Sequence, residues 1–243
     1  MAYQWVDCDR SAVRSRYDRI AHLIPFFEWL FFLPRGWRRK AVGDLALSRG
    51  DSVLEIGCGT GRNFRHLRDA VGPAGRIYGI DISPSMLGKA QQLCDAGHWH
   101  NIELRECDAA DFTAPAPLDA VLFSLSYNTM PHHRRVLRRA WAQLRPGGRL
   151  VIMDAKVPPG LGGRLILPFS LWLMRHTMLG NPLIRPWQEL AAIADRVEMS
   201  ECLFNSYFIC HARKPVVGAM AGDPSRAAND NAGPDLDHRI AAE

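Results

Sequence analysis

The sequence lacks the features that mark a secreted or metal-binding protein. Its first residues include Asp7 and Asp9 and no continuous apolar run, so no signal peptide is predicted. Its six cysteines form no C-x-x-C pair and no His-rich zinc spacing, so we expect no metal site. This cysteine usage indicates a reduced, cytoplasmic protein with buried thiols.

Long uninterrupted hydrophobic runs are also missing. The two densest apolar stretches, residues 20–34 and 165–179, are too short for a bilayer span of about 20 residues and contain charged residues. No aromatic residue follows Lys214, and we expect residues 215–243 to be a disordered tail. The net charge of +5 favours anionic partners, such as membrane surfaces, nucleic acid or acidic substrates, without choosing among them.

From Asp51 onward the chain alternates between strand and helix patterns. The alternation predicts an α/β fold with a mostly parallel seven-stranded sheet and helices on both faces. Ser83-Pro84 marks a helix start, because serine caps a helix N-terminus and proline fits the first helical position. The predicted strands are 52–56, 76–80, 102–105, 118–124, 149–154, 196–203 and 206–212. The predicted helices are 61–70, 83–96, 132–144 and 187–195.

A glycine turn after the first strand is the most informative local feature. Gly57, Gly59 and Gly61 form the pattern G-x-G-x-G. Glycine tolerates positive φ and lets a ligand approach the backbone, and a following helix N-terminus offers unpaired N–H groups. A dinucleotide fingerprint needs its third glycine one residue later, where this chain has Arg62. The turn therefore predicts a nucleotide-like cofactor but disfavours NAD.

The stretch V-L-E-I-G-C-G-T-G, with Glu55 two residues before the first glycine, resembles motif I of the class I S-adenosylmethionine (SAM) dependent methyltransferases. Residues 50–155 resemble a complete core of that class. The resemblance implies a Rossmann-like fold with an apolar helical lid, and SAM as the cofactor. We expect an N-terminal segment of lid or membrane-interface helices at 1–49, a SAM-binding core at 50–214, and a helical insertion at about 158–186.

An acid at the end of the second strand, Asp81, lies at the distance from the glycine turn where a carboxylate binds both ribose hydroxyls of a nucleoside. In the resembling family, an acid at Asp108 faces the adenine amino group, and the backbone of Ala109 reaches a ring nitrogen. Asp111 competes with Asp108 for this position. The resemblance implies a cofactor site made of Tyr17, Glu55, Gly57, Gly59, Gly61, Asp81, Ile82, Met86, Asp108, Ala109 and Ser124.

Residues after the fourth strand should border the transferable methyl group, because open α/β sheets bind ligands at the carboxyl ends of their strands. They contain no D/N-P-P-Y/F motif, and the chain has no Pro-Cys nucleophile, which disfavours DNA base methylation. Methyl transfer is an in-line displacement, so a base is needed only if the acceptor arrives protonated. Tyr17, Ser126 and His133 are the candidate catalytic residues, and Tyr127 is a weaker one. His132 and His133 could suggest a metal or a base, but adjacent residues at a helix start point in different directions, which favours a solvent-facing or capping role.

The segment Arg16-Tyr-Asp-Arg-Ile-Ala21 is similar to the Y-D-x-x-A segment of the ubiquinone/menaquinone C-methyltransferases and the bacterial phospholipid N-methyltransferases. The second Tyr-Asp of that segment is replaced by residues 22–27. We expect a hydrophobic or lipid acceptor, with a phospholipid amine favoured over a polyprenyl quinol or a soluble small molecule. A SAM-binding protein without activity is the alternative outside enzymes. Peripheral contact with the inner face of the membrane is expected, and a nucleic-acid partner is not.

Overall fold

The computed structural model describes residues 10–20, 36–158, 160, 168, 180, 181 and 183–216. Apart from residue 168, the apolar stretch 165–179 of the predicted helical insertion lies outside these residues, as do the aromatic stretch that follows Ile20 and the predicted tail from residue 217 onward.

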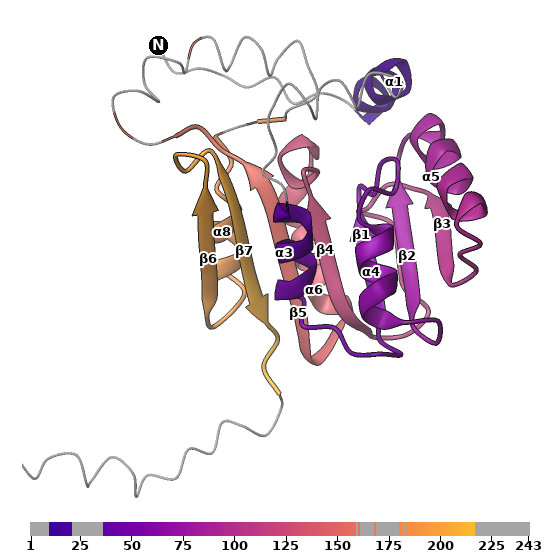
Figure 1. Ribbon diagram of the computed structural model, residues 1–243. Coiled ribbons are helices and arrows are strands. Elements are labelled where there is room, and N and C mark those ends of the chain that lie inside the picture. Colours follow the sequence, from indigo (N-terminus) through magenta and orange to yellow (C-terminus); the bar gives the residue numbers. More distant parts are fainter. Residues whose placement is uncertain are drawn as a thin grey trace, which may run out of the picture.

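A single mixed sheet forms the centre of the molecule, with the strand order β3-β2-β1-β4-β5-β7-β6 (Figure 1). Neighbouring strands from β3 to β5 are parallel, whereas β7 is antiparallel to both β5 and β6. The prediction of a mostly parallel seven-stranded sheet is confirmed. The strands are β1 Ser52–Ile56, β2 Arg76–Asp81, β3 Ile102–Glu106, β4 Leu118–Ser124, β5 Leu144–Ala155, β6 Val197–Cys202 and β7 Tyr207–Arg213.

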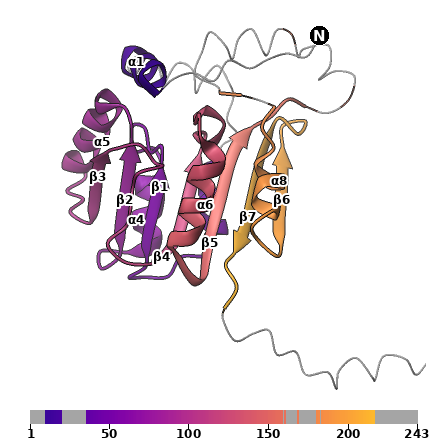
Figure 2. The same ribbon diagram turned by 180° about the vertical axis from the view of Figure 1, so that it is seen from behind.

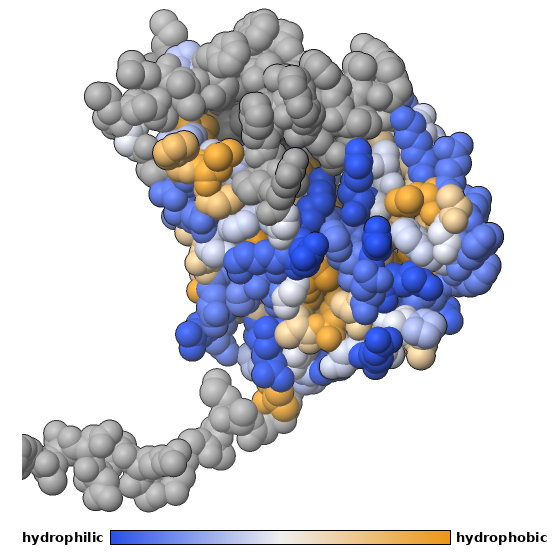
Figure 3. All heavy atoms as spheres, viewed as in Figure 1, coloured by the Kyte–Doolittle hydropathy of each residue, from blue (hydrophilic) through white to orange (hydrophobic). Residues whose placement is uncertain are grey.

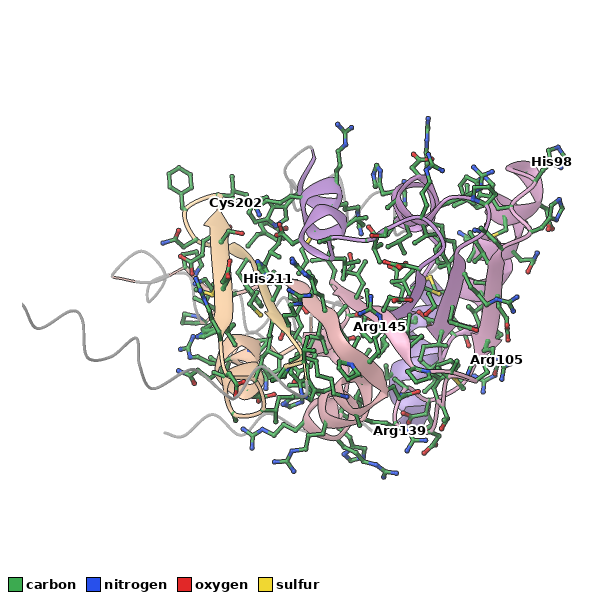
Figure 4. All side chains as sticks on the ribbon, turned by 90° about the horizontal axis from the view of Figure 1, so that it is seen from below. His98, Arg105, Arg139, Arg145, Cys202 and His211 are labelled. Carbon is green, nitrogen blue, oxygen red and sulfur yellow. The ribbon has the colours of Figure 1, made fainter. Side chains whose placement is uncertain are left out.

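Helices cover both faces of this sheet. Figure 1 shows α3 and α4 in front of the sheet, and Figure 2 shows α6 and α8 on the opposite face. Seen along the strands, Cys202 on β6 and Arg105 on β3 lie at opposite edges of the molecule (Figure 4). The helices are α1 Arg10–Ile20, α3 Trp37–Asp44, α4 Phe64–Val71, α5 Pro84–Ala96, η1 Tyr127–Thr129, α6 His133–Gln143 and α8 Pro186–Ala191.

Side chains alternate along each strand, so the sheet supplies apolar residues to two cores. Leu54 and Ile56 of β1 belong to the core that contains α6 and α8. Val53 of the same strand belongs to the core that contains α3, α4 and α5. Both cores consist of buried aliphatic and aromatic side chains, and this packing fixes the positions of the strand ends where the site is built.

Helix α3 lies within the segment 1–49, where the sequence predicted lid or membrane-interface helices without giving their bounds. Its Ala41 and Val42 are buried in the core shared with α4 and α5, and the helix contacts β4, β5 and α4. The helix therefore packs on the sheet, and its half-buried Arg38 lines the cavity described below.

Three predicted boundaries differ from the structure by three residues or more. Helix α4 begins at Phe64 rather than near Gly61, because Gly61 has φ +79°, which a right-handed helix cannot contain. The predicted turn at 145–148 lies inside β5, which already pairs at Leu144 with Leu118 of β4. The last predicted helix ends at Ala191 instead of residue 195. The start of α5 is as predicted, since the Ser83 hydroxyl accepts the N–H of Met86 at 3.2 Å and Pro84 is the first helical residue.

Candidate active site

A cavity of about 220 Å³ opens at the carboxyl end of the parallel strands. Residues at or just beyond the ends of β1, β2, β3, β4 and β5 line it, together with residues of α1 and α3 and the first residue of β7. Every predicted cofactor residue except Gly61 lines this cavity, as do the candidate catalytic residues Tyr17 and Ser126.

The three glycines of the turn have different roles. A Cβ at Gly57 would lie 2.6 Å from the Cβ of Ser126, so glycine is required for the close approach of the loop after β4. A Cβ at Gly59 would meet nothing within 4 Å, and this residue faces the cavity with φ +53°. A Cβ at Gly61 would lie 2.6 Å from the Phe64 ring. Gly61 thus packs against α4 and does not line the cavity, contrary to its predicted place in the cofactor site.

Asp81 ends β2 and holds two pieces of backbone around the cavity. Its Oδ2 accepts the N–H of Gly59 at 2.8 Å, and its Oδ1 accepts the N–H of Ser83 at 2.9 Å. Burial raises the pKa of Asp81, while these backbone hydrogen bonds oppose the rise. The carboxylate is therefore fixed between the glycine turn and the start of α5, with lone pairs left for ligand hydroxyls.

The residues after β3 form the next part of the cavity wall. Asp108 lines the cavity, and its Oδ1 accepts the N–H of Ala110 at 2.7 Å. Ala109, Ile82 and Met86 also line it. Asp111, the competing acid, is exposed and its carboxylate lies 3.7 Å from the Arg135 guanidinium. Of the two acids, the structure brings Asp108 to the cavity.

Glu55 is a buried carboxylate in the floor of the site. Its Oε1 accepts the side-chain amide of Asn63 at 2.6 Å, whereas its buried Oε2 has no hydrogen-bond partner among the residues that the structure describes. Burial raises the pKa of Glu55 to about 7, and Asn63 and the nearby Arg38 limit the rise. A buried acceptor without a donor is energetically costly, and a ligand that brings an ammonium or hydroxyl group to it would satisfy it.

Helix α1 borders the cavity through Val13 and Tyr17. The helix is fixed to the start of α5, because the Ser83 hydroxyl donates to the Asp18 carboxylate at 2.6 Å. Burial would raise the pKa of Asp18, but hydrogen bonds from Ser83 and Ser85 hold it below its usual value. A second link is the ion pair between Arg14 and Glu106 at 2.7 Å. The structure thus places Tyr17, the predicted lid residue, beside the cofactor residues.

The chain turns sharply after β4. Leu125 has φ +57°, a left-handed conformation that is strained for a branched side chain, and such strain is common at functional sites. The hydroxyl of Ser126 donates to the carbonyl of Ile56 at 2.6 Å. The hydroxyl of Ser124 accepts a hydrogen bond from Arg38 at 3.0 Å. Ser126 therefore uses its proton to hold the loop after β4 against the end of β1.

His133 does not line the cavity. Its Nε2 lies 3.2 Å from Glu189 Oε1 of α8, and its Nδ1 lies 3.3 Å from the carbonyl of Met130. Glu189 also accepts the Tyr127 hydroxyl at 2.6 Å and Arg134 Nε at 3.0 Å. These contacts join α8 to η1 and α6, so His133 and Tyr127 stabilise this packing, and neither side chain lines the cavity.

The residues that line the cavity but were not among the predicted site residues include Arg38 on α3, Asp154 near the end of β5 and Tyr207 at the start of β7. Asp154 had a signal in the sequence, since it ends the predicted strand 149–154 at the ligand-binding edge of the sheet. Tyr207 and Arg38 had none, because the hairpin and the packing of α3 on the sheet bring them to the cavity.

Comparisons with known proteins agree with this geometry. A family model described as a methyltransferase domain matches residues 53–148. The demethylmenaquinone methyltransferase of Geobacillus stearothermophilus is 25% identical over 217 residues, which cover 86% of this chain and 90% of that enzyme.

Solved structures share the fold. A SAM-dependent methyltransferase from Aquifex aeolicus aligns with a TM-score of 0.55 and 18% identity, over 85% of this chain and 98% of that one. Phosphoethanolamine N-methyltransferase 2 of Haemonchus contortus, in complex with S-adenosyl-L-methionine, aligns with a TM-score of 0.67 and 17% identity, over 84% of this chain and 60% of that one.

Fold, site and relatives together define this chain as a class I SAM-dependent methyltransferase. Within that class it resembles the demethylmenaquinone methyltransferases in sequence. Within the described ranges, no group of three or more His, Cys, Asp and Glu residues could hold a metal ion. Of the helices in those ranges, none is long and apolar enough to cross a membrane.

The residues present fit SAM. Gly59 leaves open space, Asp81 offers acceptor lone pairs for the ribose, and Glu55 has an unsatisfied oxygen for a donor group. Asp108 and Ala109 would hold the adenine at the β3 side of the cavity. When bound, SAM supplies a methyl group carried on a sulfonium sulfur, and the rest of the cofactor leaves as a neutral thioether. The protein therefore has to align the acceptor with this methyl group and remove any proton that blocks the attack.

Proposed function

We propose that the protein methylates the amino group of a phospholipid, with SAM as methyl donor. The observation that carries the proposal is the buried carboxylate of Asp154. It lies in the part of the cavity away from Asp81 and Asp108, the residues that would hold the nucleoside of SAM. Asp81 and Asp108 lie at β2 and β3, and Asp154 lies at β5, with β1 and β4 in between. Residues at the ends of β4 and β5 would therefore hold the acceptor, on the side of the cavity away from the residues that would hold the nucleoside.

The character of that end suits an amine on an apolar molecule. Leu125, Met130 and Pro131 line it with apolar surface, and Asp154 adds a negative charge when ionised. An alkylammonium group is cationic at neutral pH, and a carboxylate in an apolar setting is a favourable partner for it. The rest of the lipid would extend along the apolar lining toward the opening of the cavity.

A polyprenyl quinol that is methylated on carbon is the second candidate. The relative from Geobacillus stearothermophilus, aligned over most of both chains, is named a demethylmenaquinone methyltransferase. A quinol would also use an apolar wall and a carboxylate, since its phenol has to lose a proton before the ring carbon attacks. The apolar wall and the carboxylate of Asp154 suit both acceptors, so an experiment has to decide between them.

The first test is methyl transfer from radiolabelled SAM into a total lipid extract, followed by chromatographic separation. We expect label in an aminophospholipid that gains one or more methyl groups. Label in the quinone fraction would instead identify a polyprenyl quinol as the acceptor. No lipid label from protein that binds SAM in a parallel calorimetric titration would overturn both proposals and leave a soluble acceptor. Addition of bulk DNA or RNA in place of lipid should yield no labelled product.

Contact with a lipid surface forms part of the proposal. The turn between β6 and β7 exposes 90% of Phe204 and 42% of Leu203. Figure 1 shows this turn at the same end of the sheet as the carboxyl ends of the parallel strands, and Figure 3 shows hydrophobic surface at that corner. Each side chain would contribute roughly 1.5–3 kcal/mol if it left water for lipid. A cytoplasmic protein docked by this turn would have its cavity close to lipid headgroups at the inner face of the membrane.

We expect the double replacement of Leu203 and Phe204 by serine to weaken binding to phospholipid vesicles by about 10-fold or more, because two apolar anchors are lost. Co-sedimentation with vesicles of mixed zwitterionic and anionic lipid measures this change. Replacement of exposed Leu93 on α5 by serine is the matched control and should leave binding unaltered. Equal vesicle binding by the double variant and the wild type would contradict docking through this turn.

A further inference from the structure

We infer that Asp154 is the catalytic residue that accepts the proton of the acceptor's nucleophilic group during methyl transfer. This inference rests on the proposed function, because it assumes an acceptor that arrives protonated. Its basis is the position of the carboxylate. Asp154 is the penultimate residue of β5, only 3% of it is exposed, and it lines the cavity at the end opposite Asp81 and Asp108.

The surrounding backbone fixes the orientation of this carboxylate. Its Oδ2 accepts the N–H of Asn128 at 3.0 Å, and its Oδ1 accepts the N–H of Ala155 at 2.8 Å. The loop after β4 is held in turn by Asn128, whose amide donates to the carbonyl of Ala155 at 2.8 Å. Each carboxylate oxygen has a second lone pair, so a substrate N–H or O–H can still be accepted.

Asp154 has no ion-pair partner in the part of the chain that the structure describes. Among the described residues, the titratable groups on which the charge of Asp154 acts are Tyr207 and Cys210 of β7, and Arg38 of α3 lines the same cavity. Burial, together with the negative charge of Asp154, raises the pKa of Tyr207 to about 12, so this phenol stays protonated at neutral pH. The cysteine is also neutral there, since burial raises its pKa.

The protonation behaviour of Asp154 suits a base. Burial raises its pKa to about 7, even though backbone N–H groups favour the ionised form. A base works best when its pKa lies near the operating pH, because it is then ionised often enough to act and basic enough to take a proton. A solvent-exposed aspartate, with a pKa near 4, would be a much weaker base.

The reaction balances in atoms and electrons. With an ammonium acceptor, one N–H proton moves to Asp154 and leaves a lone pair on nitrogen. That pair forms the new N–C bond to the methyl group, while the C–S bond breaks and its electrons stay on sulfur. The methylated nitrogen carries the positive charge that the sulfonium had, and Asp154 then releases its proton to solvent. With a quinol, the phenol proton moves to Asp154 and the new bond forms to carbon, after which the ring carbon loses its hydrogen as a proton.

The decisive variant is Asp154→Asn, compared with Asp154→Glu and with Glu198→Gln, an exposed carboxylate outside the cavity as control. We expect kcat of Asp154→Asn to fall by about 100-fold or more, because the loss of a general base typically lowers reaction rates by this much. The wild-type kcat should decline as the pH falls below about 7, where Asp154 becomes protonated, and this limb should vanish in Asp154→Asn. Binding of S-adenosylhomocysteine, measured by calorimetry, should stay within about 3-fold, which separates a proton-transfer role from a defect in the cofactor site.

The amide in Asp154→Asn turns an N–H group toward one of the two backbone donors, so this variant can fail to fold. Asp154→Glu keeps a carboxylate at a changed distance and is expected to retain part of the activity with a shifted pH limb. An unchanged limb in Asp154→Glu, or a kcat of Asp154→Asn within about 3-fold of the wild type, would overturn the inference.

A spectroscopic test needs no acceptor and therefore separates this inference from the proposed function. Infrared titration of the protein bound to S-adenosylhomocysteine should reveal a protonated carboxyl band that disappears above about pH 7. Loss of this band in Asp154→Asn, or a shift of the band in Asp154→Glu, assigns the band to Asp154. A titration in which neither variant alters any band near this pH overturns the base role, whatever the lipid assay gives.

Discussion

Replacement of Asp81 by asparagine should lower the affinity for SAM by about 100-fold. The carboxylate accepts backbone N–H groups from Gly59 and Ser83, and it offers its remaining lone pairs to the ribose hydroxyls. Each hydrogen bond to a charged group contributes about 1.5–3 kcal/mol, and two such bonds to the ribose correspond to the expected loss. The asparagine amide would also oppose one of the two backbone donors, which loosens the glycine turn. Isothermal titration with SAM and with S-adenosylhomocysteine measures the change.

Asp111→Asn is the matched control for this experiment. Asp111 is an exposed acid on the same edge of the sheet and lies outside the cavity lining. Its replacement should leave the dissociation constant within about 2-fold, because an exposed ion pair contributes little. An Asp81→Asn protein that still binds SAM within 10-fold of the wild type would show that the ribose is held elsewhere.

The second large effect concerns stability in acid. Glu189 is a mostly buried acid whose side chain is 12% exposed. Burial would raise its pKa, but hydrogen bonds from His133, Tyr127 and Arg134 lower it to about 2. A carboxyl group whose pKa is depressed on folding stabilises the protein above its unfolded pKa, and this contribution is lost as the pH falls toward the folded pKa.

Glu189→Gln should therefore reduce the free energy of unfolding by about 2–3 kcal/mol at pH 7, given a pKa shift from 4.5 to about 2. The difference from the wild type should shrink between pH 4.5 and 2, where the wild-type carboxylate becomes protonated. Urea denaturation at a series of pH values measures both effects. Tyr127→Phe removes one of the three donors and should cost about 1 kcal/mol. A Glu189→Gln difference that stays constant from pH 7 to pH 2 would contradict the role of the charge.

Much of the fold and the cofactor half of the site could be predicted because their signals are local in sequence. The glycine turn, the Ser83-Pro84 helix start and an acid directly after a strand each occupy a few adjacent residues. Asp81 and Asp108 were found in this way, and both line the cavity. The position of Gly61 in the pattern could not show that the Phe64 ring takes up the space beside it.

The acceptor half was harder to predict, because its contacts join distant parts of the chain. Arg38 reaches Ser124 across 86 positions, and His133 meets Glu189 across 56. The sequence offered His133 as a base but could not show that its ring is held by a partner on α8. Asp154 was visible as the end of a predicted strand, yet only the pairing of β5 between β4 and β7 reveals that it is buried beside the cavity.

The reversed direction of β7 has a consequence for how such an enzyme can diversify. Because β7 runs against β5, the cavity receives the first residue of a hairpin strand, and the turn at residues 203–206 projects beside it. Strands β1, β2 and β3 share no hydrogen bonds with this hairpin. Insertions or replacements in the turn can thus remodel the acceptor side as a separate module, while the cofactor side keeps its register. Relatives with the same donor chemistry are then free to evolve toward different acceptors.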